Sequence, residues 1–462
     1  MTTASDAPAT PASVAPTHEA MSWGRVARVA HVALSAHQRD AALPLPPDAG
    51  MSMLPFGNGR SYGDSNLNPG GALVLTHGLD RFMAFDRTTG VLRCEAGVLL
   101  STILKLVVPQ GWFLPVTPGT QYVTVGGAIA NDVHGKNHHV AGSFGNHVRC
   151  FELLRSDGSR RVCSPPAHAD WFGATVGGLG LTGLITWAEL QLRPIANAWM
   201  ATETVRFHGL DDFFALSAES EREHEYTVAW IDCASGGAKL GRGLFSRANH
   251  APAVLDDEAL ARLPAGAAGA TRRMPLTPPV SMVNSWSLKA FNTLYFHRQR
   301  GERVHALQHY RPFFYPLDAI REWNRMYGPK GFYQYQCVVP PGDAPAVTRA
   351  LLQAIARSGM GSFLAVLKQF GAVASPGWLS FPMPGTTLAL DFPNQGEPLM
   401  RLFTELDAIV REAGGRLYPA KDGRLPAAMF QTGHPDWERF LPYLDPRFSS
   451  GLWRRVAQPV RP

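Results

Sequence analysis

A stretch rich in glycine and histidine at residues 117–145 constrains this chain more than any other part of its sequence. It reads TPGTQYVTVGGAIANDVHGKNHHVAGSFG, with few bulky apolar side chains after Ile129. Glycine has no Cβ, so a backbone rich in glycine can turn sharply and approach a ligand closely. The pair Gly126-Gly127 predicts a tight turn that enters a short buried segment. A loop so rich in donors is typical of a site that holds an anionic or polar ligand against its backbone.

Length and composition limit the class of protein. At 462 residues the chain is too long for one ordinary hydrophobic core, so we expect at least two domains. Hydrophobic residues make up 45% of the chain and charged residues 17%, which is typical of a globular protein with a large buried surface. The formal net charge of +6 slightly favours an anionic ligand or membrane surface. No long run of Lys and Arg occurs, so we expect no nucleic-acid partner.

The chain carries no sign of export. Its five cysteines are isolated from one another and no C-x-x-C motif occurs, which favours buried thiols in a reducing compartment. No apolar run approaches the roughly 20 residues of a membrane span. Residues 1–20 are rich in Ala, Thr and Pro and lack the basic start and apolar core of a signal peptide, so we predict a disordered tail. We therefore expect a cytoplasmic protein, and a peripheral contact with the inner face of the membrane is compatible with these features.

Short strands separated by glycine turns dominate the first part of the chain, so we predict the α+β class and not a repeating βαβ array. The first domain should span residues 21–194 and end at Arg193-Pro194. The alternation of apolar residues predicts strands at residues 51–56, 72–76, 81–86, 91–96, 148–155, 161–162 and 185–192, and a helix at residues 99–108.

The second domain, residues 195–415, should hold a largely antiparallel sheet with helices. Its predicted strands lie at residues 205–208, 227–232, 243–246, 332–339, 363–369, 379–382 and 387–392, and its helices at residues 211–225, 344–358 and 399–412. Residues 261–300 lack periodicity, so we predict a mobile lid there. Its apolar residues, mixed with Arg272, Arg273, Lys289 and Arg298, would suit a lipid surface, although a disordered insertion fits equally well.

Three glycine-rich stretches fall within the first domain, at residues 57–71, 119–145 and 177–183. Ordinary turns explain one such stretch, but three in one domain suggest backbone amides around a long phosphate-bearing ligand. The dinucleotide motif GxGxxG is matched only loosely by GNGRSY, which has Tyr62 where the third glycine should stand. The Walker pattern GxxxxGK[ST] is absent.

Two further motifs fit other chemistries poorly. His134, His138 and His139 invite a metal site, but no HExxH motif occurs and only Asp132 accompanies them, so we expect no metal. Residues 59–63, GRSYG, match the G-x-S-x-G letters of serine hydrolases. The strand-elbow-helix context of that motif is missing, so we interpret the match as accidental.

Several motifs together resemble a known superfamily. The stretches GNGRSYGD (residues 57–64), residues 117–148 and ATVGGLGLTG (residues 174–183) resemble the FAD-binding domain of the p-cresol methylhydroxylase, or vanillyl-alcohol oxidase, superfamily. Within it the chain is most similar to the flavin oxidases of polyprenylphosphoryl ribose, through YPLD, EWNRMYGPKGFYQYQ, VLKQFG, LDFP and GRLYPAKD. The resemblance implies a two-subdomain FAD-binding domain of the p-cresol methylhydroxylase type (PCMH-type), then a substrate domain. It also implies that a C-terminal segment, residues 416–462, returns to the flavin site.

The resemblance implies FAD as the cofactor and assigns residues to it. The members of that superfamily that bind FAD covalently use a histidine in the first glycine loop, and this chain has none there, so FAD should be held noncovalently. The implied cofactor-binding residues are Gly57, Asn58, Gly59, Arg60, Ser61, Tyr62, Gly63, Gly119, Thr124, Val125, Gly126, Gly127, His134, Gly135, Lys136, Asn137, Ile185 and Tyr418.

The resemblance also implies a reaction. FAD accepts a hydride from a secondary alcohol carbon, which becomes a ketone. Candidate catalytic residues are Tyr62, Lys421 and His134, and candidate substrate-binding residues are Lys136, Gln334, Gln336 and Lys368. The implied reaction oxidises C2 of a polyprenylphosphoryl-β-D-ribose to the 2-keto form. This is the first half of an epimerisation to the arabinose form for cell-envelope glycans. A separate NAD(P)H-dependent short-chain ketoreductase would complete it.

One departure leaves the exact sugar and lipid carrier open. Mycobacterial members of that group have Asn and Cys where this chain has Thr387 and Ala389. A second hypothesis is therefore an FAD-dependent oxidase of a free sugar, alditol or aldonolactone, although those enzymes typically carry the covalent histidine. A third is a non-catalytic protein that binds a polar ligand or metal on the same loops.

Overall fold

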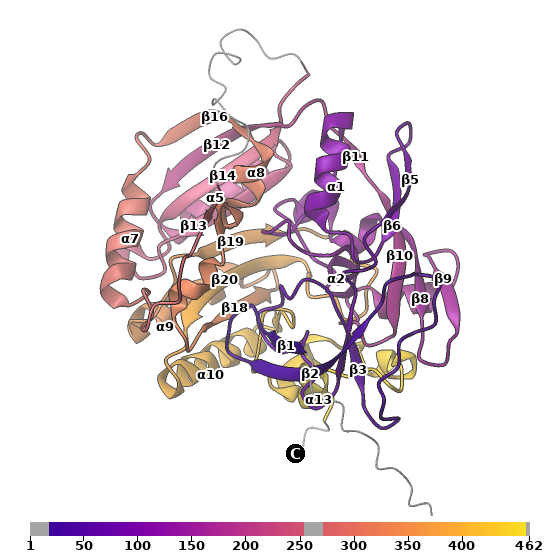
Figure 1. Cartoon of the computed structure of the whole chain (residues 1–462). Helices are drawn as coiled ribbons and strands as arrows, with labels where there is room; N and C mark the ends of the chain where they lie inside the picture. The colour runs from indigo at the N-terminus through magenta and orange to yellow at the C-terminus, as the bar shows by residue number, and fades with distance from the viewer. Residues whose placement is uncertain (1–17, 254–270, 459–462) are drawn as a thin grey trace, which may run out of the picture.

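The computed structural model describes residues 18–253 and 271–458 (Figure 1). Most of the predicted tail, residues 1–17, and the first part of the predicted lid, residues 261–270, lie outside the described residues. Helices and mostly antiparallel sheets are mixed along the chain, so the predicted α+β class is confirmed. No helix within the described ranges is long and apolar enough to span a bilayer.

The first domain is built on two small sheets. A four-stranded sheet has the order β1-β2-β4-β3, and β2, β4 and β3 run parallel. A five-stranded antiparallel sheet has the order β5-β6-β10-β8-β9, and β7 pairs with β11 beside it. The strands are β1 (His18–Met21), β2 (Arg28–Ser35), β3 (Met53–Phe56), β4 (Ala72–Leu75), β5 (Phe82–Asp86), β6 (Val91–Glu95), β7 (Trp112–Phe113), β8 (Val148–Leu154), β9 (Arg160–Cys163), β10 (Leu184–Gln191) and β11 (Arg193–Pro194). The helices are α1 (Leu100–Val107), α2 (Val125–Ala130), α3 (His138–Ala141) and α4 (Ala169–Thr175).

Two predictions in this domain are wrong. Residues 18–20 belong to β1 and pair with β2, so the predicted disordered tail is too long at its C-terminal end. Gly126 and Gly127 form no tight turn, because they lie inside α2. The Thr124 hydroxyl accepts a hydrogen bond from the Gly127 amide and caps this helix. A Cβ on Gly126 would lie 3.1 Å from the Cβ of Ala96, so glycine here permits close packing of the helix on its neighbour.

The second domain is one eight-stranded antiparallel sheet with the order β16-β12-β14-β13-β19-β20-β18-β21. Its strands are β12 (Trp199–Phe207), β13 (Tyr226–Ile231), β14 (Gly243–His250), β16 (Arg303–His309), β18 (Phe332–Val339), β19 (Ala365–Phe370), β20 (Gly385–Pro393) and β21 (Arg416–Leu417). A separate pair joins β15 (Arg272–Arg273) to β17 (Ile320–Arg321). The helices are α5 (Leu210–Ser220), α7 (Ser285–His297), α8 (Tyr310–Phe314), α9 (Ala344–Ser358) and α10 (Glu397–Glu412).

Three predictions in this domain need correction. Residues 379–382 form no strand, because this short apolar run lies in a loop whose Phe381 ring packs on His134 of the first domain, with centroids 5.6 Å apart. Residues 285–297 of the predicted lid form the regular helix α7, which Asn284 caps through the amides of Trp286 and Ser287. Its apolar residues lie on two faces, which hid the helical period in the sequence. The predicted C-terminal segment begins at residue 416, yet residues 416–417 are the last strand of the sheet.

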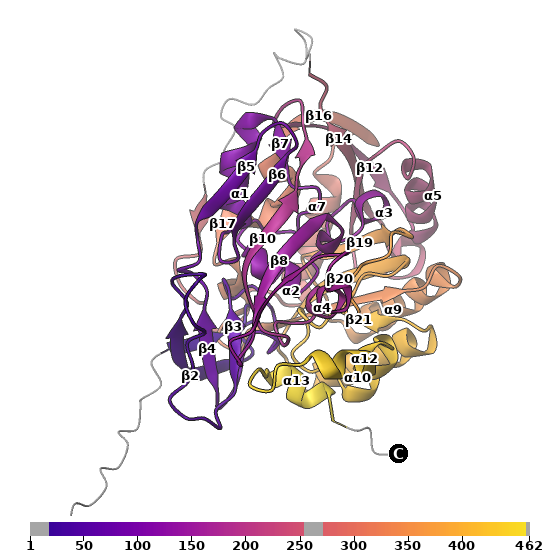
Figure 2. The ribbon, with the colours of Figure 1, turned by 90° about the vertical axis from the view of Figure 1, so that its right-hand side faces the viewer.

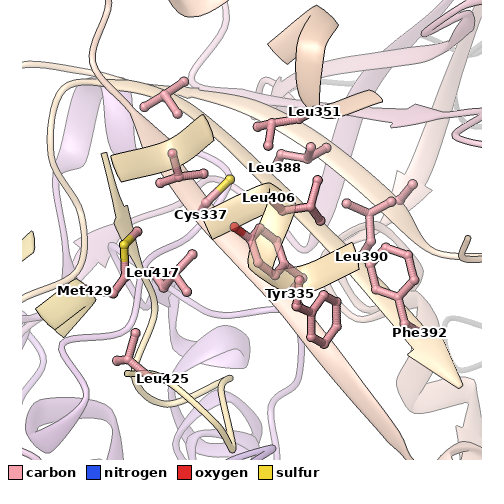
Figure 3. Packing of buried hydrophobic residues seen from close by; sticks show 14 of the residues in the cluster. Tyr335, Cys337, Leu351, Leu388, Leu390, Phe392, Leu406, Leu417, Leu425 and Met429 are labelled. Carbon is pink, nitrogen blue, oxygen red and sulfur yellow. The ribbon is translucent and has the colours of Figure 1, made fainter. Parts of the chain in front are cut away.

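Alternation along β18, β19 and β20 divides the sheet into two faces. Tyr335, Leu390 and their neighbours in the same rows point into the core beneath α9 and α10, where they are almost fully buried (Figure 3). Leu367 of β19 belongs to the same buried cluster. Each fully buried side chain of this size contributes about 1.5–3 kcal/mol to folding. The intervening residues of each strand point to the opposite face. That face carries polar side chains and looks toward the first domain.

The C-terminal segment crosses back to the first domain. Its helix α11 (Ala427–Gly433) contacts both α10 and α13 (Gly451–Val456), and Arg439 of α12 (Trp437–Phe440) forms an ion pair with Asp170 of α4 in the first domain (this segment is yellow in Figure 2). The Tyr62 amide donates to the carbonyl of Ala420 at 2.9 Å, and Arg455 forms an ion pair with Asp64. Gly63 lies against residue 422, where a Cβ would meet the carbonyl oxygen of Asp422 at 2.1 Å. The segment therefore closes over the first glycine loop.

We predict that Gly63→Ala weakens this closure. The new methyl group meets backbone that cannot move freely, so the free energy of unfolding should fall by about 2–3 kcal/mol in urea titrations. Gly342→Ala is the matched control, because a Cβ there meets no atom within 4 Å. Equal unfolding midpoints for the two variants would contradict the predicted contact.

Candidate active site

A cavity of about 1010 Å³ lies between the first domain and the polar face of the eight-stranded sheet. All three glycine-rich stretches line it from one side. Strands β13, β18, β19 and β20 line it from the other side. This volume is at the upper end of the range for small-molecule sites, so the cavity has room for an extended cofactor and part of a substrate.

Most predicted site residues line this one cavity. They are Gly57, Asn58, Gly59, Arg60, Ser61, Tyr62, Gly119, Thr124, Gly126, Gly127, His134, Gly135, Lys136, Ile185, Gln334, Gln336, Lys368, Tyr418 and Lys421. Three predicted cofactor contacts do not line it. Gly63 lies against residue 422, Val125 is fully buried in the core of the first domain, and the Asn137 side chain donates to the carbonyl of Pro115 at 2.8 Å.

The first and second glycine stretches are fitted tightly together. A Cβ on Gly57 would lie 2.5 Å from the Thr124 hydroxyl oxygen, which is already engaged with the Gly127 amide. The Asn58 side chain donates to the carbonyl of Tyr122 at 2.6 Å. Only glycine at position 57 allows this approach, and it leaves backbone facing the cavity. A polar cofactor such as FAD fits such a wall, because its phosphates and ribose need donors.

Unpaired polar atoms also point to a polar cofactor. The Ser65 hydroxyl, both side-chain polar atoms of Asn66 and Nδ1 of His134 are buried without a hydrogen-bond partner among the described residues. All three residues line the cavity. Buried polar groups are normally paired, so these atoms fit a ligand that supplies the partners. Ser65 and Asn66 were missed in the sequence, although they continue the first glycine stretch beyond its predicted binding residues.

His134 is held as a neutral ring. The Gln336 amide nitrogen lies 3.0 Å from His134 Nε2, and an amide nitrogen can only donate, so Nε2 accepts and Nδ1 carries the proton. Burial holds the pKa of His134 well below its ordinary value, and the charge of Lys368 lowers the pKa further. The ring is enclosed by Phe370 and Tyr418, at centroid distances of 4.9 and 5.3 Å. His134 can therefore donate a hydrogen bond into the cavity but is a poor proton acceptor at neutral pH.

Three lysines, Lys136, Lys368 and Lys421, line the cavity. Burial lowers the pKa of Lys136 to about 7 and that of Lys368 to about 8. Lys136 donates to the carbonyl of Phe313 and lies over its ring at 4.5 Å. Lys368 donates to the carbonyl of Gly135 at 3.2 Å. Neither ammonium group has a carboxylate ion-pair partner among the described residues, so both suit an anionic ligand.

Lys421 belongs to a second polar cluster with Tyr62, Gln334 and Asp391. Its ammonium group lies 3.8 Å from the centre of the Tyr62 ring. The Gln334 amide donates to Asp391 Oδ1 at 2.5 Å, as expected from residues that face each other across β18 and β20. Burial lowers the pKa of Lys421, and the nearby charge of Asp391 opposes this shift. Burial raises the pKa of Tyr62 well above its ordinary value, so its phenol stays protonated.

Asp391 was missed in the sequence. It is fully buried, and its Oδ2 has no hydrogen-bond partner within the described ranges. The period of β20 places it on the same face as Thr387 and Ala389, both of which line the cavity. The motif LDFP contained this signal, but the cross-strand register to Gln334 does not follow from the sequence.

The other two histidines of the loop have packing roles. The His138 ring packs on Phe370 at 4.4 Å, and His139 Nε2 lies 3.0 Å from the carbonyl of His224. Within residues 18–253 and 271–458 no group of three His, Cys, Asp or Glu side chains is arranged to hold a metal ion.

The fold and the site define an FAD-dependent oxidoreductase, and comparison with known proteins agrees. A family model described as an FAD binding domain matches residues 32–164. The chain belongs to the decaprenylphosphoryl-beta-D-ribose oxidase family. It is 38% identical to the Mycolicibacterium smegmatis protein of that name over 95% of this chain and 97% of that protein. The predicted enzyme class, FAD cofactor and superfamily are thereby confirmed, and the non-catalytic hypothesis is excluded.

Other relatives share all or part of this likeness. An uncharacterized Streptomyces coelicolor protein is 36% identical over 78% of this chain and 100% of its own length. The Delta(24)-sterol reductase of Homo sapiens is 29% identical over 31% of this chain and 28% of its own length.

We predict that Gly57→Ala weakens FAD binding by about tenfold or more, because the new methyl group displaces the Thr124 hydroxyl from its helix cap. Fluorescence titration of the apoprotein with FAD measures this. Gly209→Ala is the control, since a Cβ there meets no atom within 4 Å.

Acid denaturation of the wild-type protein should release all flavin, and flavin retained on the precipitate would contradict noncovalent binding.

Proposed function

We propose that this protein oxidises C2 of a polyprenylphosphoryl-β-D-ribose to the 2-keto form. The observation that carries the proposal is the full-length likeness to a decaprenylphosphoryl-beta-D-ribose oxidase. The partly buried lysines at positions 136 and 368 support it, because their charges suit the phosphate of such a substrate and they line the same cavity as the polar groups that would hold its sugar. Gln334 and Gln336 line the same cavity and would offer polar groups to the sugar.

FAD, when bound, supplies the hydride acceptor for such an oxidation. The residues that would hold it are those of the three glycine-rich stretches that line the cavity, together with Ser65, Asn66 and the Nδ1 proton of His134. The chain must orient the sugar hydroxyl and receive its proton. Among the predicted catalytic residues, Lys421 suits the second task better than Tyr62. Burial favours the neutral amine of Lys421, which can accept a proton, while Tyr62 remains a protonated phenol that can only position the hydroxyl.

The product would be a ketose still linked to its lipid. A separate NAD(P)H-dependent short-chain ketoreductase would reduce it to the arabinose form, and this is the partner we propose. A substrate with a polyprenyl chain resides in a bilayer, so the protein should make a peripheral contact with a membrane.

The proposal can be tested against an oxidase of free sugars. Polyprenylphosphoryl ribose should bleach the flavin absorbance of the anaerobic protein, and free alditols or aldonolactones should leave it unchanged. Bleaching by free alditols alone would overturn the proposal in favour of the second hypothesis. Thr387 and Ala389, where this chain departs from the mycobacterial members, line the cavity beside Lys368. Because this departure leaves the exact sugar open, a lipid-linked form of a different pentose is the next substrate to compare.

We predict that Lys421→Ala keeps the yellow flavin but lowers kcat by about 100-fold or more, because the variant lacks the group that accepts the hydroxyl proton. Lys105→Ala on the exposed surface of α1 is the matched control. Turnover by Lys421→Ala at the wild-type rate would remove this residue from the mechanism.

The pH profile should respond to Asp391. A neutral Lys421 accepts the proton, so kcat should rise with pH through the pKa of Lys421. The charge of Asp391 raises that pKa, so Asp391→Asn should move the rising limb to lower pH. Asparagine can still accept the hydrogen bond from Gln334, so this variant removes the charge of Asp391 but keeps the hydrogen bond. A limb that stays in place, or moves to higher pH, would show that another group titrates.

A further inference from the structure

Helix α7 presents two apolar faces, and only one of them is packed. Leu288, Asn292 and Phe296 recur every four residues and are buried against the eight-stranded sheet. On the opposite face Trp286 is 85% exposed and Leu294 is 72% exposed. In Figure 1 the helix lies at the outer edge of the molecule. Because α7 already packs on the protein through its other face, Trp286 and Leu294 are not needed for the hydrophobic core.

The inner face of α7 is fixed firmly. The Asn292 side chain donates to Asp232 at 2.9 Å, and Asp232 also forms a buried ion pair with Arg242. Arg242 in turn lies over the ring of Phe296 at 4.6 Å. Because these contacts hold the helix in one orientation, its outer face stays exposed on the surface of the protein.

The segment before α7 adds more exposed apolar residues. Leu276, Val280 and Met282 are 59%, 72% and 50% exposed. The amide of Met282 donates to the carbonyl of Met326 at 2.9 Å, which ties this segment to the protein. We call Leu276, Val280, Met282, Trp286 and Leu294 the α7 surface. Monomeric soluble proteins rarely expose so many large apolar side chains within one short segment.

The charge of this segment indicates what kind of surface would cover the exposed apolar residues. Residues 271–301 contain five basic residues and no Asp or Glu: Arg272, Arg273, Lys289, Arg298 and Arg300. Of these, Arg273 is paired with Glu322, and Arg272, Lys289, Arg298 and Arg300 are exposed in the same segment as the apolar side chains. Apolar residues surrounded by Lys and Arg bind anionic bilayers through both burial and charge.

The cavity reaches the helix that carries the α7 surface. Tyr295 and Arg298 of the same helix region line the cavity wall, as do Ile320 and Arg321 of β17. Ile320 is itself 43% exposed. A ligand in the cavity could thus extend an apolar chain toward this surface without crossing the core.

We propose that the α7 surface docks the protein on an anionic lipid bilayer, so that the lipid chain of the substrate passes from the bilayer to the cavity beside α7. The inference rests on the proposed function for the identity of that chain, but the docking itself does not require it. A second copy of this chain or a protein partner would be the competing occupants.

Vesicle co-sedimentation tests the docking with the purified flavin-loaded protein. The wild type should bind phosphatidylcholine vesicles that contain phosphatidylglycerol and bind pure phosphatidylcholine weakly. The double variant Trp286→Ser/Leu294→Ser should bind the anionic vesicles about tenfold more weakly. Val162→Ser, an exposed apolar residue on β9 of the first domain, is the matched control and should bind like the wild type. Retained flavin colour verifies that each variant is folded.

Two substrates separate this inference from the proposed function. The double variant should oxidise a water-soluble short-chain phosphoryl ribose at the wild-type rate, but oxidise vesicle-borne long-chain substrate more slowly. Equal vesicle binding by wild type and double variant overturns the docking site, as does a wild-type dimer that the variant converts to monomer in sedimentation velocity. Vesicle binding without flavin reduction by either substrate instead overturns the proposed function and leaves the docking in place.

Discussion

The two-sided character of β18, β19 and β20 is the constraint on which the rest of this structure depends. One face of these strands is apolar and is covered by α9 and α10, and this packing stabilises the second domain. The other face carries Gln334, Gln336 and Lys368, which line the cavity opposite the first domain and need a polar cover. The first domain and its glycine loops provide that cover, so the active site lies where the two domains meet.

Burial of charge then gives this interface its chemistry. Lys136, Lys368 and Lys421 reach one cavity from three segments that are far apart in the chain. Each loses water there, and burial lowers its pKa. Such charges are costly unless a ligand or a carboxylate compensates them. The anionic substrate that we propose would compensate Lys136 and Lys368, and the charge of Asp391 raises the pKa of Lys421.

Much of the fold could be predicted from local patterns, and the failures have local causes. Helix α9 matches its predicted range because Pro345 stands in its first turn and Gly359, with φ of 67°, ends it. The α2 and α7 helices were missed because glycine pairs and two apolar faces conceal a helical period. At the site, most of the residues that the motifs predicted line the cavity. Gly63, Val125 and Asn137, which the motifs also predicted, do not line the cavity and pack elsewhere.

The sequence by itself determined the superfamily, the flavin cofactor and the residue types of the site, because glycine loops and polar strand positions are local features of the chain. Tertiary structure alone decided which of those residues act together. The register between β18 and β20 pairs Gln334 with Asp391, and the return of the C-terminal segment brings Lys421 over Tyr62. It also decided that α7 turns a second apolar face outward. These relations depend on contacts between distant segments, and only the packed chain brings such segments together.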